Sequence, residues 1–446
     1  MKSQHVTTDL PGPRARAILE RDAGVVSPSY PRDYPFVMSH GRGVEAWDVD
    51  GNRFLDFAAG IAVCATGHCH PLVVQAVKDA ADRFLHISSD FWHEGQVRLG
   101  ERVAELDPMG EPVMSFFAQS GTESVEGALK LARHVTGRPR FLGFLGGFHG
   151  RTLGALAVTS SKCTQQSGFF PTMPGVTHVP YPDPYRPLFA GADQGLAVLD
   201  YIELVLFASN VPADEVAGIL VEPILGEGGY IVPPDSFLLG LRALCDRHGI
   251  LLIFDEVQCG IGRTGKMFAG RHWNVAPDIM TLAKGLGSGL PIGLVVAKRR
   301  IMEQWPRGAH GNTFGGNPLC CAAALATLDL VEHEYAANAA VVGAYFIKRL
   351  RELQTRHEVI GEVRGKGLMI GMELVTDRGS RTPARQLCEA LLHRAFHNGL
   401  LLLSCGSSTV RFIPPLSVTR AEVDEALALL EPSLVEAREG LSAVPA

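Results

Sequence analysis

Short apolar runs alternate with amphipathic helical patterns through the middle of this 446-residue chain. Leu72–Ala81 and Ser124–Val135, for example, repeat their apolar residues at helical spacing. Alternation of this kind is typical of a mostly parallel sheet covered by helices. We therefore expect an α/β fold, with strands at Val113–Ala118, Gly218–Val221, Ile250–Phe254 and Ile279–Ala283.

The two ends of the chain follow other patterns. Residues 1 to about 35 are rich in Pro and Arg and show little periodicity, which predicts an arm rather than a core. We expect a large α/β domain over residues 70–320 and a smaller α+β domain built from residues 321–446 together with residues 1–69. The expected elements of the smaller domain are a hairpin at Val44–Phe57, a long helix from Pro318 toward Leu353, strands at Gly367–Leu374, Leu400–Ser404 and Thr409–Ile413, and a last helix announced by the capping-box spacing of Thr419 and Glu422.

The composition is that of a globular protein without a strongly charged partner surface. Hydrophobic residues make up 46% of the chain and charged residues 20%, which argues against disorder. The net charge is −6, so no strong basic field predicts binding to nucleic acid or to a membrane surface. No apolar run approaches the ~20 residues that span a bilayer, and residues 1–16 lack a signal-peptide pattern. We expect a soluble, cytoplasmic protein.

The segment Gln119–Glu123 lies where a predicted strand gives way to a predicted helix. Ser120 and Glu123 have capping-box spacing, and the backbone amides at a helix start can bind a phosphate. The same residues also fit an ordinary capped helix, so this motif alone leaves both interpretations open.

Three polar residues, Glu222, Asp255 and Lys284, each follow directly on an apolar run. The carboxyl ends of parallel strands line the crevice in which α/β proteins bind ligands. Each residue alone also fits a solvated strand end. Together with the helix start they supply a phosphate cradle, a carboxylate for a ring nitrogen and an amine for an aldehyde. Pyridoxal phosphate needs these groups, so we expect it as the cofactor, with Lys284 as the Schiff-base amine and Asp255 on the pyridine nitrogen.

Two other motifs compete with this interpretation. Gly260–Gly265 followed by Lys266 matches a phosphate-binding loop except at Met267, which has no hydroxyl for Mg²⁺, and no amphipathic helix follows. His68-Cys69-His70 resembles half of a metal site, but a fourth ligand and a partner cluster are missing. We expect a glycine loop without a nucleotide in the first case and a structural turn in the second.

A set of motifs in chain order resembles the class III, fold-type I pyridoxal-phosphate aminotransferases over nearly the whole chain. The nearest likeness is to 4-aminobutyrate and ornithine aminotransferases. The resemblance implies the two-domain α/β fold described above and a homodimer with shared active sites. The motifs are Trp47–Phe57, Gly60–Pro71, Gly147–Thr152, Glu222–Gly229, Asp255–Gly265, Lys284, Thr313–Pro318, and Leu403–Gly406 with Val410-Arg411.

The resemblance also implies a role for individual residues in holding the cofactor. Lys284 would carry it, as the strand-end argument already suggests. The further implied contacts are Asp255 to the pyridine nitrogen, Gln258 to the ring hydroxyl, Phe148 stacked on the ring, Ser120, Gly121 and Thr122 on the phosphate, and Thr313 on the phosphate of the neighbouring subunit.

For the substrates, the resemblance implies contacts from Ile61, Arg151, Glu227 and Arg411. Arg411 would clamp the α-carboxylate of 2-oxoglutarate and Arg151 the carboxylate furthest from it, because a guanidinium grips a carboxylate with two parallel hydrogen bonds. An ω-amino donor has no carboxylate near its amine. Glu227 stands where the family has a glutamate that covers this arginine during the donor half-reaction.

We therefore expect an aminotransferase that moves the amino group of an ω-amino acid, such as 4-aminobutyrate or ornithine, to 2-oxoglutarate, giving a semialdehyde and glutamate. An amino-acid racemase or epimerase of the same fold and an acetylornithine-type aminotransferase remain alternatives. The sequence does not rank the donors, and it leaves open whether dimers pair into tetramers.

Overall fold

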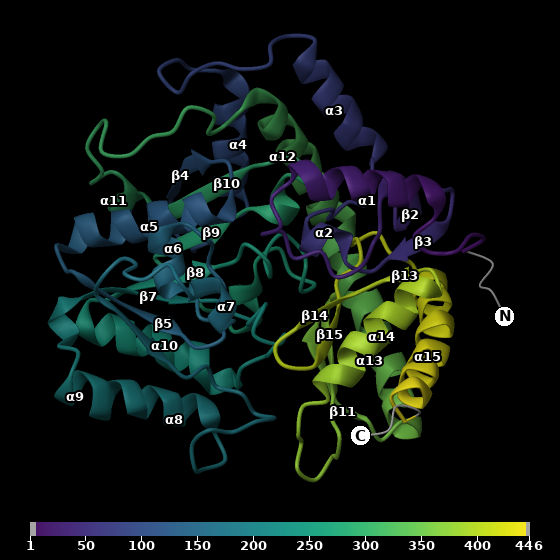
Figure 1. Ribbon diagram of the computed structural model, residues 1–446. Coiled ribbons are helices and arrows are strands. Elements are labelled where there is room, and N and C mark those ends of the chain that lie inside the picture. Colours follow the sequence, from purple (N-terminus) through teal and green to yellow (C-terminus); the bar gives the residue numbers. More distant parts are fainter. Residues whose placement is uncertain (1–5, 443–446) are drawn as a thin grey trace.

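The computed structural model describes residues 6–442, and its largest sheet has seven strands in the order β4-β10-β9-β8-β7-β5-β6 (Figure 1). The five strands from β9 to β6 are parallel, whereas β10 is antiparallel to both of its neighbours. The mostly parallel sheet that the sequence predicts is therefore confirmed. The strands are β4 (Val113–Ala118), β5 (Arg140–Phe144), β6 (Val176–Val179), β7 (Val216–Val221), β8 (Leu251–Asp255), β9 (Ile279–Leu282) and β10 (Gly293–Lys298).

Helices cover both faces of this sheet. In Figure 1, α5 (Gly121–Thr136) lies above the sheet and α10 (Asp235–His248) lies below it. Every residue of β7 is buried, as is usual for a parallel strand that is packed on both faces. The apolar residues of α5 that repeat at helical spacing are also buried. This burial fixes the helix start at the carboxyl end of β4.

A second sheet is antiparallel, with the strand order β11-β12-β15-β14. In its register Gly371 pairs with Arg411, and Glu373 pairs with Thr409. The strands are β11 (Ile360–Lys366), β12 (Met369–Leu374), β14 (Leu403–Cys405) and β15 (Thr409–Phe412), and the neighbouring helices are α14 (Arg385–His397) and α15 (Arg420–Ser442). The predicted capping box of the last helix is confirmed, because the Glu422 amide donates to Thr419 Oγ1 at 3.2 Å.

A third sheet joins the two ends of the chain. The predicted hairpin forms as β2 (Glu45–Asp48) and β3 (Arg53–Asp56), with β1 (Met38–Arg42) on one side and β13 (Leu400–Leu401) parallel to β3 on the other. Phe54, Phe396 and Leu401 share one apolar cluster. These contacts support the grouping of residues 1–69 with residues 321–446, and the division at residues 70 and 320 stays a proposal.

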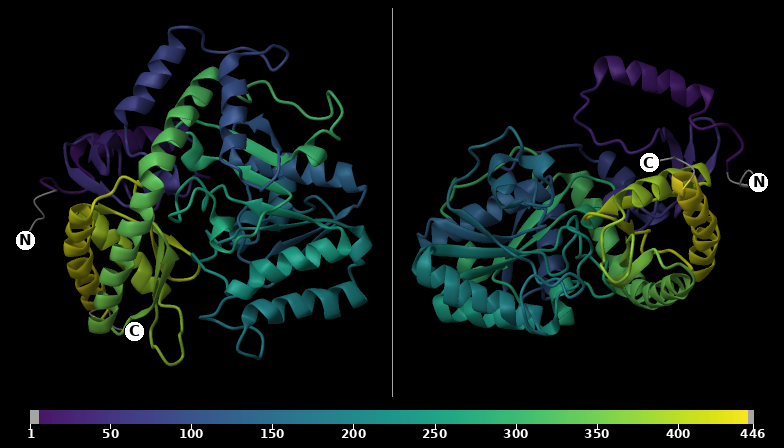
Figure 2. Two further views of the ribbon diagram at one scale, coloured as in Figure 1. Left: turned by 180° about the vertical axis from the view of Figure 1, so that it is seen from behind. Right: turned by 60° about the horizontal axis from the view of Figure 1, so that its bottom comes forward.

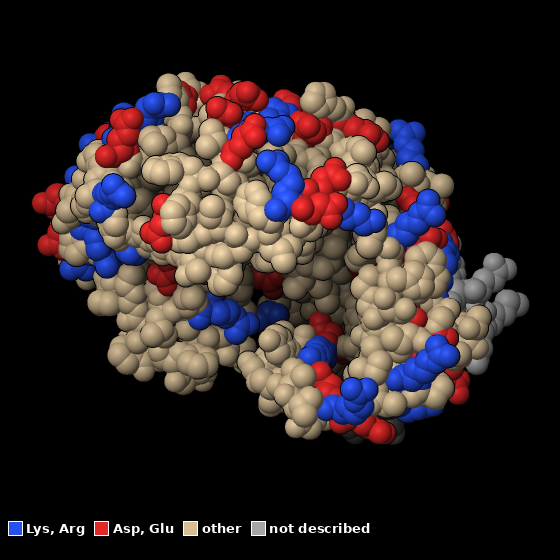
Figure 3. Space-filling view, turned by 90° about the horizontal axis from the view of Figure 1, so that it is seen from above, with Lys and Arg blue, Asp and Glu red and all other residues tan. Residues whose placement is uncertain are grey.

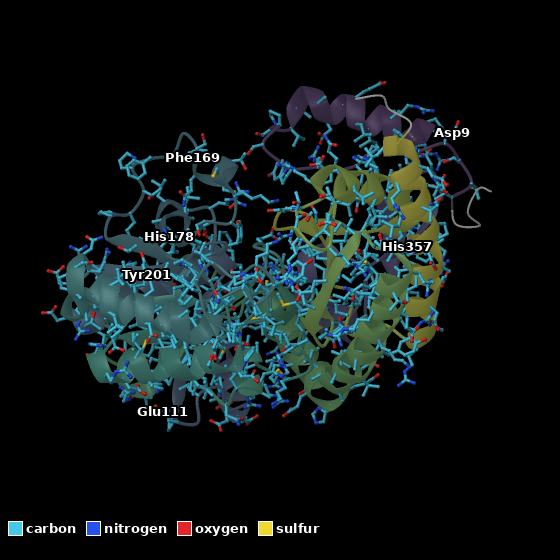
Figure 4. The ribbon with its side chains drawn as sticks, turned by 90° about the horizontal axis from the view of Figure 1, so that it is seen from below. Asp9, Glu111, Phe169, His178, Tyr201 and His357 are labelled. Carbon is cyan, nitrogen blue, oxygen red and sulfur yellow. The ribbon has the colours of Figure 1, made fainter. Side chains whose placement is uncertain are left out.

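One long helical span connects the large sheet with the antiparallel sheet. The left view of Figure 2 shows it as the long green helix, formed by α12 (Pro318–Leu330), the π-helical turn η5 (Val331–Tyr335) and α13 (Ala336–Arg356). α12 packs on α3 (Pro71–Ala81) and α4 (Glu94–Glu105), while α13 packs on β11. In Figure 4, His178 and Tyr201 lie in the part of the molecule that contains the large sheet. His357, which directly follows α13, lies in the part that contains the antiparallel sheet.

Several elements differ from the sequence expectation. The N-terminal arm contains a helix, α1 (Pro13–Val25), whose only buried residue is Ala15. Asp50 accepts hydrogen bonds from the amides of Arg14 and Ala15, both at 2.9 Å, and no local periodicity reveals this distant cap. Strands β1, β5, β6, β10 and β11 were not expected either. The strand expected at Leu400–Ser404 is interrupted at Leu402 and contributes β13 and β14 to two different sheets.

The glycine loop Gly260–Gly265 is packed rather than open. The amides of Gly262, Arg263 and Gly265 donate to carbonyls of the loop and its flank. A Cβ on Gly265 would lie 2.9 Å from Ala340. The short 3₁₀ turn η3 (Ala269–His272) comes after the loop in place of a long helix. The amides of these three residues are therefore not available to a nucleotide phosphate.

The His68-Cys69-His70 segment is a structural turn. His68 Nε2 lies 2.8 Å from Asp56 Oδ2, and the His70 ring accepts from the Leu72 amide at the start of α3. Within residues 6–442 we find no group of three or more potential metal ligands.

The described part of the chain contains no helix that is long and apolar enough to cross a membrane. On the face shown in Figure 3, acidic and basic side chains are interspersed, and the face is hollowed near its centre. The cytoplasmic location expected from the sequence stays a prediction.

Candidate active site

A cavity of about 440 Å³ opens at the carboxyl ends of β4, β8 and β9. Strand ends that meet at one edge of an α/β sheet are the usual place for a ligand. This cavity brings together seven of the residues singled out in the sequence: Ser120, Gly121, Thr122, Phe148, Arg151, Asp255 and Lys284.

The start of α5 forms one wall of the cavity. Ser120 is the N-cap, and its Oγ accepts from the Glu123 amide at 3.3 Å. The Glu123 carboxylate in turn accepts from the Gln119 amide at 2.6 Å, so the helix begins with two reciprocal caps. Thr122 Oγ1 lies 2.9 Å from Thr152 Oγ1. The amides and the dipole of this helix start favour an anion in the cavity.

Asp255 ends β8 and is held by three hydrogen bonds. Its Oδ1 accepts from the Val257 amide at 3.0 Å and from Thr281 Oγ1 at 3.1 Å, and its Oδ2 lies 2.7 Å from His149 Nδ1. Burial alone would lower the pKa of His149, but the Asp255 carboxylate outweighs burial and raises it. The three hydrogen bonds fix the direction of the carboxylate.

Glu222 lies beside this pair, at the end of β7. It accepts from the Phe148 amide at 2.9 Å and from the Gly226 amide at 2.8 Å. Burial raises the pKa of Glu222 to about 7, against the opposing effect of His149. Glu222 thus connects the end of β7, the Phe148 segment and the turn that begins at Gly226.

Lys284 follows β9 directly and has a left-handed backbone, with φ of +42°. Burial lowers the pKa of its amine, and the carboxylates of Asp255, Glu227 and Glu222 oppose this effect. A lowered pKa increases the fraction of neutral amine, which is the form that reacts with an aldehyde.

Phe148 and Arg151 lie on another wall of the cavity. Phe148 is half-buried, and the Arg151 guanidinium carbon lies 5.8 Å from the centre of its ring. Arg151 is exposed, so its charge is available to a ligand at the cavity mouth.

Glu227 and Arg411 form an ion pair through Glu227 Oε1 and Arg411 Nη1. The Arg411 side chain is 5% exposed and that of Glu227 is 13% exposed. Burial alone would raise the pKa of Glu227, but the Arg411 guanidinium lowers it. The buried Nε of Arg411 has no hydrogen-bond partner among the described residues. This atom is a free donor that a carboxylate ligand could satisfy.

Six of the residues singled out in the sequence do not lie on the cavity wall: Glu222, Glu227 and Arg411, described above, and also Gln258, Ile61 and Thr313. Gln258 is buried behind it, and its Oε1 accepts from the Tyr230 hydroxyl at 2.7 Å. Ile61 and Thr313 are exposed on surface segments. Thr313 still lies near the site, because its neighbour Asn312 donates to Phe117 O at 2.8 Å.

Sequence reasoning assigned no role to several residues that line the cavity. The most informative is His149, which stands next to Phe148 in a quoted motif but gave no sign of its pairing with Asp255. The others are Val63, Gln119, Gly150, Val257, Ala283 and the segment 289–292. The glycine-rich run after Lys284 is the only sequence feature that indicates a role for the segment 289–292 in the cavity.

The donor set of the cavity fits pyridoxal phosphate. The start of α5 can bind an anion, and Phe148 offers a ring for stacking. The oriented carboxylate of Asp255 can bind a ring nitrogen, and the amine of Lys284, with its lowered pKa, can react with an aldehyde. These are the four groups that the cofactor requires from a protein.

Comparisons with known proteins agree with this geometry. Residues 27–434 match the family model of class-III aminotransferases. The chain is 39% identical to an alanine/serine racemase of Pyrococcus horikoshii, over 99% of this chain and 94% of that protein. It is 41% identical to an acetylornithine aminotransferase of Caldanaerobacter subterraneus, over 91% of this chain and 96% of that protein.

Among solved structures, an amine transaminase from an uncultivated Pseudomonas species with pyridoxal phosphate bound superposes with a TM-score of 0.86 at 33% identity. The superposition covers 97% of this chain and 100% of that one. The chain therefore belongs to the class III aminotransferases, pyridoxal-phosphate enzymes of fold type I.

Proposed function

We propose that this aminotransferase moves the amino group of an ω-amino acid, 4-aminobutyrate-like or ornithine-like, to 2-oxoglutarate, and so forms a semialdehyde and glutamate. The Glu227–Arg411 ion pair is the observation that carries this proposal. A buried guanidinium without a counter-charge is costly. With Glu227 in place, an ω-amino donor that brings no carboxylate to this position leaves Arg411 paired.

The acceptor half-reaction places the opposite demand on the same arginine. The α-carboxylate of 2-oxoglutarate takes Arg411, and the free Nε of this residue gives it a second donor for a two-point grip. Glu227 then has to move aside. Arg151 holds the far carboxylate at the cavity mouth, and Ile61 contributes an apolar contact at the rim.

The residues of the cavity hold the cofactor in defined positions. Ser120, Gly121 and Thr122 bind its phosphate, Phe148 stacks on its ring, and Gln258 bonds the ring hydroxyl. Asp255, held by His149, keeps the ring nitrogen protonated. When bound, pyridoxal phosphate supplies an electron sink that weakens the bond between the amine-bearing carbon and its hydrogen.

Lys284 acts as general base and then as general acid. It takes the proton from the amine-bearing carbon of the donor and returns a proton to the other end of the reacting system. Burial lowers the pKa of its amine, which favours the neutral form that the first step needs. For the acceptor, the same lysine moves the proton in the reverse direction.

We also propose a homodimer as the catalytic unit. Ser89 Oγ donates to Asn312 O at 3.1 Å, and the His86 and Phe314 rings lie 4.9 Å apart, so the segments around residues 86–92 and 312–314 are neighbours. Trp92 and Phe314 are large exposed aromatic residues of these segments. Exposed apolar clusters of this kind mark protein interfaces. Thr313 would contact the phosphate in the partner's cavity.

A racemase or epimerase is the second candidate, because the alanine/serine racemase relative is aligned over nearly the whole chain. Such an enzyme needs the same lysine and cofactor but no amino acceptor. It would bind an α-amino acid, whose carboxylate would have to displace Glu227 from Arg411 in every turnover. An acetylornithine-type aminotransferase is a variant of the first proposal with another donor.

One experiment separates these candidates. The purified holoenzyme is incubated with 4-aminobutyrate, 5-aminovalerate, ornithine, lysine and acetylornithine, each with 2-oxoglutarate, and glutamate is measured. In parallel, single enantiomers of alanine, serine, leucine and isoleucine are incubated without acceptor and analysed by chiral chromatography. Glutamate from an ω-amino donor supports the proposal. Inversion without acceptor, together with no glutamate, supports the racemase instead.

A further inference from the structure

The turn Gly226–Tyr230 carries Glu227 and lies between the large sheet and the antiparallel sheet. It begins at the Gly226 amide, which donates to Glu222 Oε2 at 2.8 Å. It closes on itself, because the amides of Gly229 and Tyr230 donate to Gly226 O at 3.0 and 3.2 Å. The Glu227 side chain leaves this turn toward Arg411 on β15.

The backbone of the same turn is fixed to the antiparallel sheet at two further points. The Gly406 amide, in the connection between β14 and β15, donates to Glu227 O at 2.8 Å. Arg364 on β11 donates to Gly229 O through Nε at 3.0 Å and through Nη2 at 2.6 Å. Gly406 has φ of +56°, and a Cβ there would lie 2.9 Å from Gly228 O, so this close approach requires glycine.

Arg364 is itself held in one orientation. Its Nη1 donates to Glu362 Oε2 and to Glu373 Oε2, each at 2.6 Å, and its Nη2 donates to Thr409 Oγ1 at 3.1 Å. Glu373 also accepts from Arg186 Nε at 2.8 Å. The Arg364 side chain is 10% exposed. Burial would lower the pKa of Arg364, but the two carboxylates outweigh it and raise the pKa.

In this arrangement, the backbone of the turn and the carboxylate of Glu227 are held by different contacts. Three anchors hold the backbone of the turn, whereas a single ion pair holds the carboxylate. Arg364 and Arg411 belong to the same sheet. The antiparallel sheet therefore holds both the backbone of this turn and the guanidinium of Arg411, and Arg364 supplies two of the hydrogen bonds that hold the turn.

We propose that Arg364 is a positioning residue for the Glu227 switch: it fixes the turn so that Glu227 leaves and regains Arg411 by side-chain rotation alone. This inference rests on the proposed function, in which Arg411 changes partner between the two half-reactions. Without the hydrogen bonds from Arg364, the turn no longer keeps its position. Glu227 then pairs with Arg411 less often, and the enzyme no longer discriminates between the donor and the acceptor.

The test measures single-turnover rate constants of the two half-reactions, with the ω-amino donor that is active in the panel and with 2-oxoglutarate, and takes their ratio. Four holoenzymes are compared: wild type, Arg364→Met, Glu227→Ala and the double variant. We expect Arg364→Met to shift the ratio in the same direction as Glu227→Ala, on the order of tenfold, since two bonds from a charged donor are lost. In the Glu227→Ala background we expect Arg364→Met to change the ratio by less than about twofold, the scatter of independent effects.

Two controls separate positioning from general damage. Arg242→Met removes another partly buried arginine, one that donates to Asp278 at 2.8 Å and lies away from the turn, and should leave the ratio unchanged. Arg364→Lys keeps a positive charge between Glu362 and Glu373, so it should recover the stability that Arg364→Met loses. It should not fully restore the wild-type ratio of the two rate constants. Hydrogen exchange of the peptide that contains residues 226–230, measured by mass spectrometry, should accelerate in Arg364→Met and not in Arg242→Met.

The outcomes are distinguishable. If Glu227→Ala leaves the ratio at its wild-type value, the switch of the proposed function is refuted. If Glu227→Ala shifts the ratio while Arg364→Met does not, or if Arg364→Met has the same effect in both backgrounds, the proposed function stands and the positioning role of Arg364 is refuted. Unchanged exchange of the turn in Arg364→Met would also refute it.

Discussion

His149 Nδ1 lies 2.7 Å from Asp255 Oδ2, and both side chains are buried at the inner end of the cavity. The Val257 amide and the Thr281 hydroxyl occupy the other oxygen of Asp255. The carboxylate therefore cannot rotate without breaking three hydrogen bonds. A ring nitrogen that meets Asp255 meets an anion of fixed direction.

Replacing His149 by Leu should weaken cofactor binding on the order of tenfold, by analogy with the loss of a group that orients a metal ligand. The carboxylate of Asp255 would lose one of the three hydrogen bonds that orient it. Titration of the apoenzyme with pyridoxal phosphate, followed by visible absorbance, measures the effect. His178→Leu is the matched control, because His178 contacts Val158 O rather than Asp255; equal affinity losses in the two variants would contradict the proposed role.

Lys284→Ala should lower turnover by about a thousandfold or more, since general acid–base catalysis by a positioned group contributes factors of this size. The cofactor should still bind through the helix start and Asp255, but borohydride should no longer fix it to the chain. Intact-protein mass spectrometry after reduction measures this directly. Lys266→Ala serves as control, because the Lys266 amine donates to Arg271 O on the surface. A covalent adduct in Lys284→Ala would show that another lysine holds the cofactor.

Much of the site could be predicted because it depends on local patterns. The periodicity of α5 and the apolar runs of β8 and β9 place Ser120, Asp255 and Lys284 at one sheet edge, and parallel pairing brings the strand ends together. The fully apolar strand β7 places Glu222 at the same edge in the same way.

Contacts between distant segments could not be predicted in this way. His149 and Asp255 are 106 positions apart, and no periodicity couples them. The cap that Asp50 provides for α1 also depends on tertiary contact. The Glu227–Arg411 pair was expected only from family resemblance, and the anchor from Arg364 to Gly229 became visible only in the structure.

Thr313→Ala should weaken cofactor binding by about tenfold, as expected for the loss of a hydrogen bond to a charged phosphate. The effect should depend on protein concentration, because the proposed contact reaches the partner's cavity. Sedimentation at decreasing concentration, with cofactor occupancy measured in parallel, tests both statements. Thr355→Ala on the exposed face of α13 is the control. A monomer that retains full cofactor occupancy would contradict the shared site.

His68 and Asp56 should give the stability of the protein a characteristic dependence on pH. The hydrogen bond with Asp56 is the largest cause that raises the pKa of His68 to about 10, and burial opposes it. An unfolded histidine has a pKa of about 6.5. A group whose pKa is raised on folding contributes its stabilisation fully below the unfolded value and loses it as the pH rises through the folded value. The contribution should therefore be complete below about pH 6.5 and decline up to about pH 10.

The free energies of unfolding of wild type and His68→Gln, measured by urea denaturation between pH 6 and pH 10.5, should differ most at the lowest pH and converge at the highest. We expect a difference of about 2 kcal/mol at the lowest pH, the scale of a hydrogen bond between charged groups. His333→Gln, on the exposed side of the π-helical turn, should show no such convergence. A difference between wild type and His68→Gln that stays constant across this range would show that folding does not raise the pKa of His68.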